Sequence, residues 1–309
     1  MSLVEDAFQL FLKRISLPES QLEAARRSNG ALRRHVEQDS YFGPFIIDSF
    51  LNGSFARRTS LQPIKDVDVI VVVDKEWLKA QPSSAMESLR RVLAKRYDER
   101  RTQRRRRAVN VRLSDIWLDV LLAVAPEGSE SPLQIPDRTA SSWIATHPRL
   151  QLSLIRDLGK KTNGNYSRLV RLLKAWARSR VSQADRPASF VLECCVYHLL
   201  FRDPWSFAGA LDESFSSLLD NLVKWDFGRA GNWLPWGAPI VSDPALPEVN
   251  VASSWDFNCA DRFKERVEST LRRIDGAQRS RWEDTEVQHW QRVFGYPFPS
   301  SLAAERAAR

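Results

Sequence analysis

Apolar residues recur at spacings of three and four along most of the chain, and this period predicts helices. We predict them over residues 3–15, 19–38, 84–97, 150–157, 165–180, 188–201 and 259–275. The pattern differs in residues 66–73, a run of β-branched residues, and two further β-rich runs follow at 109–113 and 116–124. The sequence therefore predicts an α+β fold, in which an N-terminal helical spine precedes a small mixed sheet and a helical lobe follows it.

Two domains are expected from the chain length of 309 residues. We place the first at residues 1–145, which hold the sheet and the N-terminal helices, and the helical lobe at 146–309. Residues 226–258 are an irregular stretch rich in Pro, Gly and Trp. After the last predicted helix, the chain ends in a tail that contains Trp and Pro.

Composition excludes several classes of protein. Hydrophobic residues make up 43% and charged residues 27%, which excludes intrinsic disorder and collagen-like repeats. No apolar run approaches the roughly 18 residues of a membrane span, and the N-terminus lacks the pattern of a signal peptide. The 3 cysteines fit neither a disulfide framework nor a zinc spacing. We therefore expect a cytoplasmic protein that does not associate with membranes.

Positive charge is concentrated rather than spread along the chain. The 46 Lys and Arg exceed the 38 Asp and Glu, giving a net charge of +8. Six of the residues in 100–107 are Arg, and Arg26, Arg27, Arg33 and Arg34 form a second group. Such blocks favour nucleic acids or nucleotide phosphates, although a solvated helix face or loop explains the run at 100–107 equally well.

The candidate chemistry lies between residues 53 and 68. Side chains alternate along a strand, so Asp66 and Asp68 project from the same face. Two carboxylates this close repel each other unless a cation lies between them, and oxygen ligands suit Mg²⁺ or Mn²⁺. Ahead of them, Gly53 allows a ligand to approach the backbone, and Ser54 offers a hydroxyl and an amide to phosphate. Asp119, inside a later strand, is the best candidate for a third carboxylate.

Such a site would align a nucleotide hydroxyl on the α-phosphate of a second nucleotide, with pyrophosphate leaving. Taken alone, Asp-X-Asp at a strand start is more often a capped or solvated turn, and Gly-Ser is weaker still. The ordered combination with a hydrophobic strand and a later strand Asp favours the catalytic interpretation. Asp115 has the same strand parity as Asp119, but it lies next to Ser114 in a predicted hairpin turn and is not included.

These motifs resemble a known family. Gly-Ser, an eleven-residue gap and Asp-X-Asp resemble the polymerase-β-type nucleotidyltransferase signature. The fuller form, with Thr59 and Asp-Val-Asp-Val, resembles the bacterial CD-NTases, relatives of cyclic GMP-AMP synthase and the oligoadenylate synthases. Residues 168–176, 189–193 and 242–252 are similar to three further family motifs, so the resemblance covers most of the chain.

The resemblance implies a polymerase-β-like core, an oligoadenylate-synthase-like helical lobe and an active site in the cleft between them. Ser54 would bind the triphosphate, while Asp66, Asp68 and Asp119 would hold Mg²⁺ or Mn²⁺. Its further implied nucleotide contacts are Gly53, Lys174, Ser189 and Phe190, the last stacking on a base. A solvated helix residue is the less favoured alternative for Lys174, whereas a core residue is an equal alternative for Phe190. Asp243 and Asn250 are interpreted as structural.

The implied activity is synthesis of a cyclic di- or trinucleotide second messenger from nucleoside triphosphates, ATP among them, in anti-phage signalling. Two alternatives remain: a linear oligonucleotide or RNA-adding nucleotidyltransferase, and an inactive nucleic-acid-binding member of the fold. Candidate partners are a HORMA-type activator, double-stranded DNA at residues 100–107, and a downstream effector that the product reaches. The zinc insertion of cyclic GMP-AMP synthase has no counterpart here, which argues against DNA activation through such an element.

Overall fold

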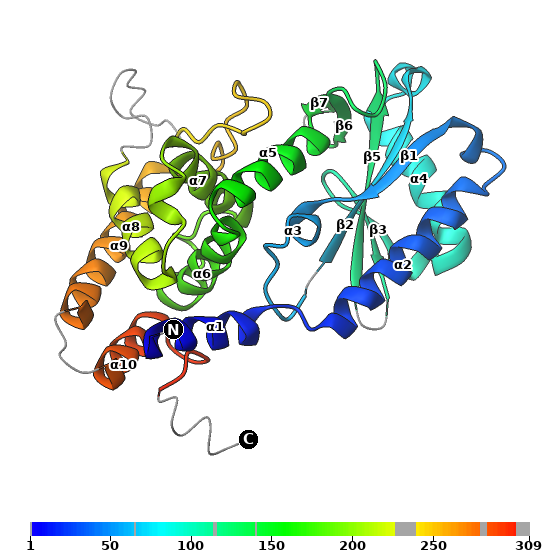
Figure 1. Ribbon diagram of the computed structural model, residues 1–309. Coiled ribbons are helices and arrows are strands. Elements are labelled where there is room, and N and C mark those ends of the chain that lie inside the picture. Colours follow the sequence, from blue (N-terminus) through cyan, green and yellow to red (C-terminus); the bar gives the residue numbers. More distant parts are fainter. Residues whose placement is uncertain are drawn as a thin grey trace. The chain divides into compact units, whose positions relative to one another are not determined.

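The computed structural model describes residues 2–64, 66–113, 116–139, 141–225, 239–278 and 283–300 (Figure 1). Its internal contacts divide the chain into two compact units. Leu17–Ser153 form one, here called the sheet unit, and Met1–Ser16 with Leu154–Arg309 form the other, here called the helical unit. The first helix thus belongs to the helical unit, which differs from the division at residue 145 expected from the sequence.

The sheet unit is built on one mixed sheet. Its strands are β1 (Ile46–Leu51), β2 (Asp66–Asp74), β3 (Thr102–Arg104), β4 (Val109–Arg112), β5 (Trp117–Ala125), β6 (Leu133–Asp137) and β7 (Ser142–Thr146). The order is β1-β2-β5-β4-β3, with β6 joined to β5 and β7 to β6. Strands β2 and β5 are parallel, and the other pairs are antiparallel. The predicted α+β class with a mixed sheet is confirmed.

The two faces of this sheet differ in cover. Helices α2 (Glu19–Glu37) and α4 (Pro82–Tyr97) pack their apolar residues on the face that carries Val67, Val69 and Val71 of β2. On the opposite face, Ile70 and Val72 pack against residues of β5 and β6. Asp66 and Asp68 share this second face by strand alternation, at the end where β2 begins. The short helices are α3 (Gly53–Ala56) and the 3-10 turns Gly43–Phe45, Lys75–Lys79 and Glu99–Arg101.

In its described residues, the helical unit consists mainly of helices, with a 3-10 turn at Trp205–Phe207. Its helices are α1 (Leu3–Ile15), α6 (Asn165–Arg180), α7 (Ser189–Arg202), α8 (Leu211–Lys224), α9 (Phe257–Gln278) and α10 (Glu283–Phe294), while α5 (Pro148–Lys161) begins just before the unit boundary. An aromatic cluster holds α1 against α10: the ring of Phe8 lies 4.9 Å from Trp290 and 5.7 Å from Phe294, edge to face. Within the described ranges, every helix is too short or too polar to cross a bilayer.

Most predicted elements are confirmed, but two helices of the helical unit were not predicted. Helix α8 lies between the predicted helix at 188–201 and the irregular stretch, and α10 lies in what was expected to be a tail. Both are amphipathic, and each places buried aromatic or aliphatic side chains in the core of the unit. All three cysteines are free, and Cys194 and Cys195 are buried in α7.

A buried ion pair joins α6 to α7. Lys174 Nζ donates to Glu193 Oε1 at 2.6 Å, and the two side chains are only 4% and 2% exposed. The alternative interpretation of Lys174 as a solvated helix residue is therefore wrong. Removing one member of a buried ion pair leaves the other charge in the core without a partner. This lowers the free energy of unfolding by about 3–5 kcal/mol.

We therefore predict that Lys174→Met lowers the free energy of unfolding by about 3 kcal/mol in urea denaturation. Adding Glu193→Leu should recover most of this loss, because the double variant replaces both charges with apolar groups. Lys224→Met provides the control, since its pair with Asp220 is exposed and should change stability by less than about 1 kcal/mol. An equally small effect of Lys174→Met would contradict a buried pair.

Candidate active site

Three aspartates predicted as metal ligands lie on adjacent strands of one face. In the parallel pairing of β2 with β5, Asp68 is the register partner of Asp119, and Asp66 is the partner of Trp117. Residues paired across parallel strands point to the same side of the sheet. Asp66 is exposed, and Asp68 and Asp119 are half-buried, so solvent and ligands reach this group.

Asn110 fixes one oxygen of Asp119. Strand β4 pairs with β5 on its other side, in a register that sets Asn110 opposite Asp119. The Asn110 amide Nδ2 donates to Asp119 Oδ1 at 2.7 Å, and Asn110 itself is buried. The Asp119 carboxylate is therefore oriented by a neighbour, which leaves its second oxygen for a ligand. Sequence reasoning missed Asn110, although a lone amide within the β-branched run Val109-Asn110-Val111 was a usable signal.

The Gly-Ser turn lies directly against the carboxylate of Asp68. Gly53 has a positive φ of 65°, and a Cβ placed on it would lie 1.7 Å from Asp68 Oδ2. The backbone N–H of Asn52 donates to the carbonyl of Asp68 at 2.9 Å, which ties the turn to the start of β2. Glycine is thus required here both by the left-handed backbone and by the close approach.

Ser54 is held at the start of α3. Its Oγ shares a hydrogen bond of 2.9 Å with Ser60 Oγ, and its carbonyl accepts from the N–H of Thr59 at the same distance. Thr59 is completely buried, so this loop is anchored in the sheet unit. The anchor places the Ser54 hydroxyl and backbone amide within the turn that contacts Asp68.

The carboxylate oxygens of the three aspartates suit a hard divalent cation. Phosphate oxygens of the bound nucleotide would supply most of the other ligands of this cation. Among the described residues, no three His, Cys, Asp or Glu side chains form a cluster that could hold a metal ion. Mg²⁺ is commonly held by one or two carboxylates together with water and substrate phosphates. The neighbouring Asp68 and Asp119, with Asp66 two residues ahead on the same face, supply such a set.

Trp117 is a second feature that sequence reasoning missed. It is 42% exposed on β5, beside Asp66 in the register, and the Arg112 guanidinium lies 4.8 Å from its ring centroid. The Trp117 ring offers a flat apolar face next to the carboxylates.

The remaining predicted nucleotide contacts belong to the helical unit, and each is described within that unit. Lys174 takes part in the buried pair with Glu193. Ser189 is exposed as the first residue of α7, where backbone N–H groups and the helix dipole favour anions. Phe190 follows it and is half-buried. Their roles toward a nucleotide stay predictions.

The structural interpretation of Asp243 and Asn250 is supported by their bonds. Asn250 Oδ1 accepts from the N–H groups of Val241 and Ala252, each at 3.0 Å. Asp243 Oδ1 accepts from the N–H of Ala245 at 2.8 Å. Both side chains thus brace a loop. Asp115, which was not included in the site, lies outside the described residues.

Part of the Arg-rich run is bound within the protein. Arg106 and Arg107 both donate to the buried carboxylate of Asp137, and Arg104 pairs with Glu87 at 3.2 Å. These contacts fix the β3–β4 turn to the sheet unit. Fewer charges of the run are therefore available to a polyanion than the sequence suggests.

Comparisons with known proteins show the family to which the chain is related. Residues 1–158 match the family described as "Second Messenger Oligonucleotide or Dinucleotide Synthetase domain". The chain is 26% identical to the cyclic AMP-AMP-AMP synthase of Acinetobacter sp. (strain ATCC 27244 / 9458), with 91% of this chain and 81% of that protein covered. It is 23% identical to the cyclic AMP-AMP-GMP synthase of Enterobacter hormaechei subsp. hoffmannii (strain UCI 50), with 96% and 92% covered.

Solved structures show the same fold. The structure of E. coli MS115-1 CdnC with ATP has a TM-score of 0.80 and 20% identity, and covers 97% of this chain and 99% of that chain. The same protein in a HORMA complex gives the same TM-score over 96% of this chain and 99% of that chain. The family match spans half of the sequence and includes Gly53, Ser54 and the three aspartates. The chain therefore belongs to the Second Messenger Oligonucleotide or Dinucleotide Synthetase family and is a nucleotidyltransferase of the bacterial CD-NTase group.

Proposed function

We propose that the chain synthesises a cyclic di- or trinucleotide second messenger from nucleoside triphosphates, ATP among them, with Mg²⁺ or Mn²⁺ as cofactor. The observation that carries this proposal is the register that pairs Asp68 with Asp119, with Gly53 packed against the Asp68 carboxylate. The two relatives named above, both synthases of cyclic trinucleotides that contain adenine, support the choice of product.

Each bond would form by displacement at phosphorus. The oxygen of a ribose hydroxyl bonds to the α-phosphorus of a triphosphate, the bond from that phosphorus to the bridging oxygen breaks, and pyrophosphate leaves. A bound divalent cation lowers the pKa of the attacking hydroxyl and neutralises charge on the phosphates. Ser54 would hold the triphosphate through its hydroxyl and amide. Asp119, with Oδ1 held by Asn110, would receive the hydroxyl proton on its other oxygen.

Ring closure repeats this chemistry within one molecule. After the first bonds form, the linear intermediate still carries a triphosphate at one end and a free hydroxyl at the other. The hydroxyl then attacks the α-phosphorus at the other end of the same molecule. The bond from this phosphorus to the bridging oxygen breaks, the last pyrophosphate leaves, and the product has no terminal phosphate. A nucleotidyltransferase that makes linear oligonucleotides, or one that adds nucleotides to RNA, would not carry out this ring closure.

The proposal extends to partners. A HORMA-type activator is supported by the HORMA complex of the similar E. coli protein. Double-stranded DNA is the proposed ligand of Arg100, Arg101 and Arg105, which have no carboxylate partner among the described residues. Binding there would be electrostatic and would weaken steeply with salt, because counterions are released from the phosphates. The product would reach a downstream effector in anti-phage signalling.

The product itself distinguishes the activities. We expect the protein, incubated with four labelled nucleoside triphosphates and Mg²⁺, to give a phosphatase-resistant product whose mass identifies a cyclic di- or trinucleotide. A phosphatase-sensitive ladder would replace this proposal with the linear alternative. If no triphosphate is consumed with DNA and a HORMA-type partner present, an inactive nucleic-acid-binding protein is the remaining assignment.

Replacing two carboxylates should remove activity without unfolding the protein. Asp66→Asn with Asp68→Asn is expected to lower the rate of product formation at least ~100-fold, because the ligands for the cation are lost. Asp157→Asn removes one exposed carboxylate from α5 and should leave the rate unchanged. If the double variant keeps its rate of synthesis and its melting temperature, Asp66 and Asp68 are not the ligands of a catalytic cation.

Gly53→Ala tests the contact between the turn and Asp68. The added Cβ would displace the Asp68 carboxylate, so we expect at least ~10-fold lower activity together with backbone strain of about 1–2 kcal/mol. Gly164→Ala is the matched control, because Gly164 has a φ of 80° and nothing lies within 4 Å of its added Cβ. It should show a similar loss of stability and normal activity below its melting temperature. Equal activity in the two variants would show that the close approach is unimportant.

A further inference from the structure

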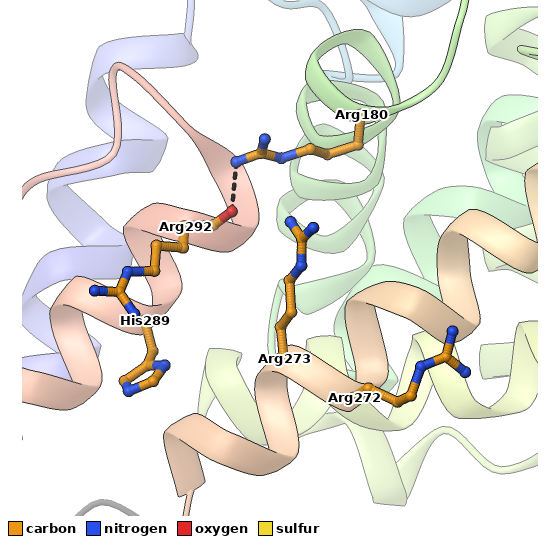
Figure 2. Close-up of a pocket in the computed structure, with 5 residues that line it drawn as sticks. All are labelled: Arg180, Arg272, Arg273, His289 and Arg292. Carbon is orange, nitrogen blue, oxygen red and sulfur yellow. Dashed lines mark hydrogen bonds between the residues drawn. The ribbon is translucent and has the colours of Figure 1, made fainter.

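A basic pocket lies within the helical unit, among α6, α9 and α10. It has a volume of about 590 Å³ and is lined by Arg180, Arg272, Arg273, His289 and Arg292 (Figure 2). All five side chains carry or can carry positive charge. None of them belongs to the residues assigned to the reaction.

The pocket gathers positive charge from three helices. Within the parts of the chain that the structure describes, none of the five lining side chains forms an ion pair with a carboxylate. Burial, and then the proximity of Arg273, hold the pKa of Arg180 below its usual value. In Figure 2 the guanidinium of Arg273 extends from α9 toward that of Arg180, whereas Arg272 points away from it. Like charges that face each other in a concave site create a strong field for an anion.

Hydrogen bonds and aromatic packing hold the side of the pocket that α10 forms. Arg180 Nε donates to the carbonyl of Val293 at 2.7 Å, and its Nη2 donates to the carbonyl of Arg292, which fixes the end of α10 to the end of α6. Trp290 and Phe294 anchor the same helix in the aromatic cluster around Phe8. Arg180 thus has a structural task. The side chains of Arg273 and Arg292 are exposed, and neither donates a hydrogen bond to another described residue.

We propose that this pocket binds a compact anion that carries two or more phosphate groups. Arg guanidinium groups bind phosphate through paired N–H donors, and a volume of this size suits a small molecule. A DNA duplex would instead contact a stripe of charge along an open surface. The same chemistry is shared by inorganic triphosphate and by the triphosphate of a free nucleotide, and the experiment separates these two sources.

The test is calorimetric titration of the Asp66→Asn, Asp68→Asn protein without divalent metal. These conditions weaken binding at the reaction site and make the readout independent of any product. Inorganic triphosphate is the probe, with ATP and adenosine titrated in parallel. Equal affinities for triphosphate and ATP would assign the site to phosphate alone, and tighter binding of ATP would assign it to a nucleotide; adenosine should not bind in either case.

Charge reversal identifies the site. In this background, Arg273→Glu should weaken triphosphate binding at least about tenfold, because a donor becomes a repelling charge, and Arg292→Glu should do the same. Arg266→Glu is the matched control: it lies exposed on α9, two turns before Arg273, outside the lining. It should change affinity less than about twofold. Circular dichroism melts check that the variants fold.

Several results would overturn the proposal. These are an unchanged affinity in Arg273→Glu and Arg292→Glu, equal losses in Arg266→Glu, or no triphosphate binding by the parent protein. If Arg273→Glu weakens binding of a short DNA duplex but triphosphate does not bind, the pocket is part of a nucleic-acid surface. None of these outcomes bears on the proposed synthesis, which has its own readout.

Discussion

The parallel pairing of β2 with β5 is the constraint on which the active-site account depends. It sets Asp68 beside Asp119 on the face opposite the one that α2 and α4 cover, at the end of the sheet where β2 begins. A shift of one residue in either strand would turn one carboxylate into the apolar core. The core side of the sheet, with Val67 and Val69 fully buried, opposes such a slip. The hydrophobic packing of one face therefore fixes the chemistry of the other.

The contacts around this pair have separate tasks. Gly53 gives the Gly-Ser turn its approach to Asp68, and Asn110 orients Asp119 from the next strand. Each contact positions one carboxylate without neutralising its charge. A cation held by these carboxylates would be shared with a phosphate bound at the turn. In the helical unit, by contrast, the buried charge of Lys174 is matched by Glu193.

Part of the fold and of the active site could be predicted from the sequence. The other features depend on contacts between distant parts of the chain. Alternation along a strand was sufficient to place Asp66 and Asp68 on one face. The pairing of Asp68 with Asp119 depends on the register of two strands about 50 residues apart, which no local pattern encodes. Helix α10 was missed because its sequence is Trp-containing and polar, and its apolar face is recognised only against Phe8 of α1. The burial of Lys174 likewise depends on a partner in another helix.

The distribution of positive charge also differs from the expectation. In the run at residues 100–107, Arg104, Arg106 and Arg107 form ion pairs with carboxylates of the sheet unit. The arginines around the pocket of the helical unit lie in no such run, and only the packing of three helices gathers them. Local density of arginine in the sequence is therefore a poor guide to where unbalanced charge resides.

The most direct test of the central claim is a crystal structure of the protein with Mn²⁺ and a nonhydrolysable nucleoside triphosphate, with the cation located by anomalous scattering. We predict Mn²⁺ bound by Asp66, Asp68 and Asp119 and by oxygens of the triphosphate, with the phosphates against Gly53 and Ser54. Mn²⁺ and triphosphate bound together elsewhere, with the three carboxylates free of the cation, would contradict it.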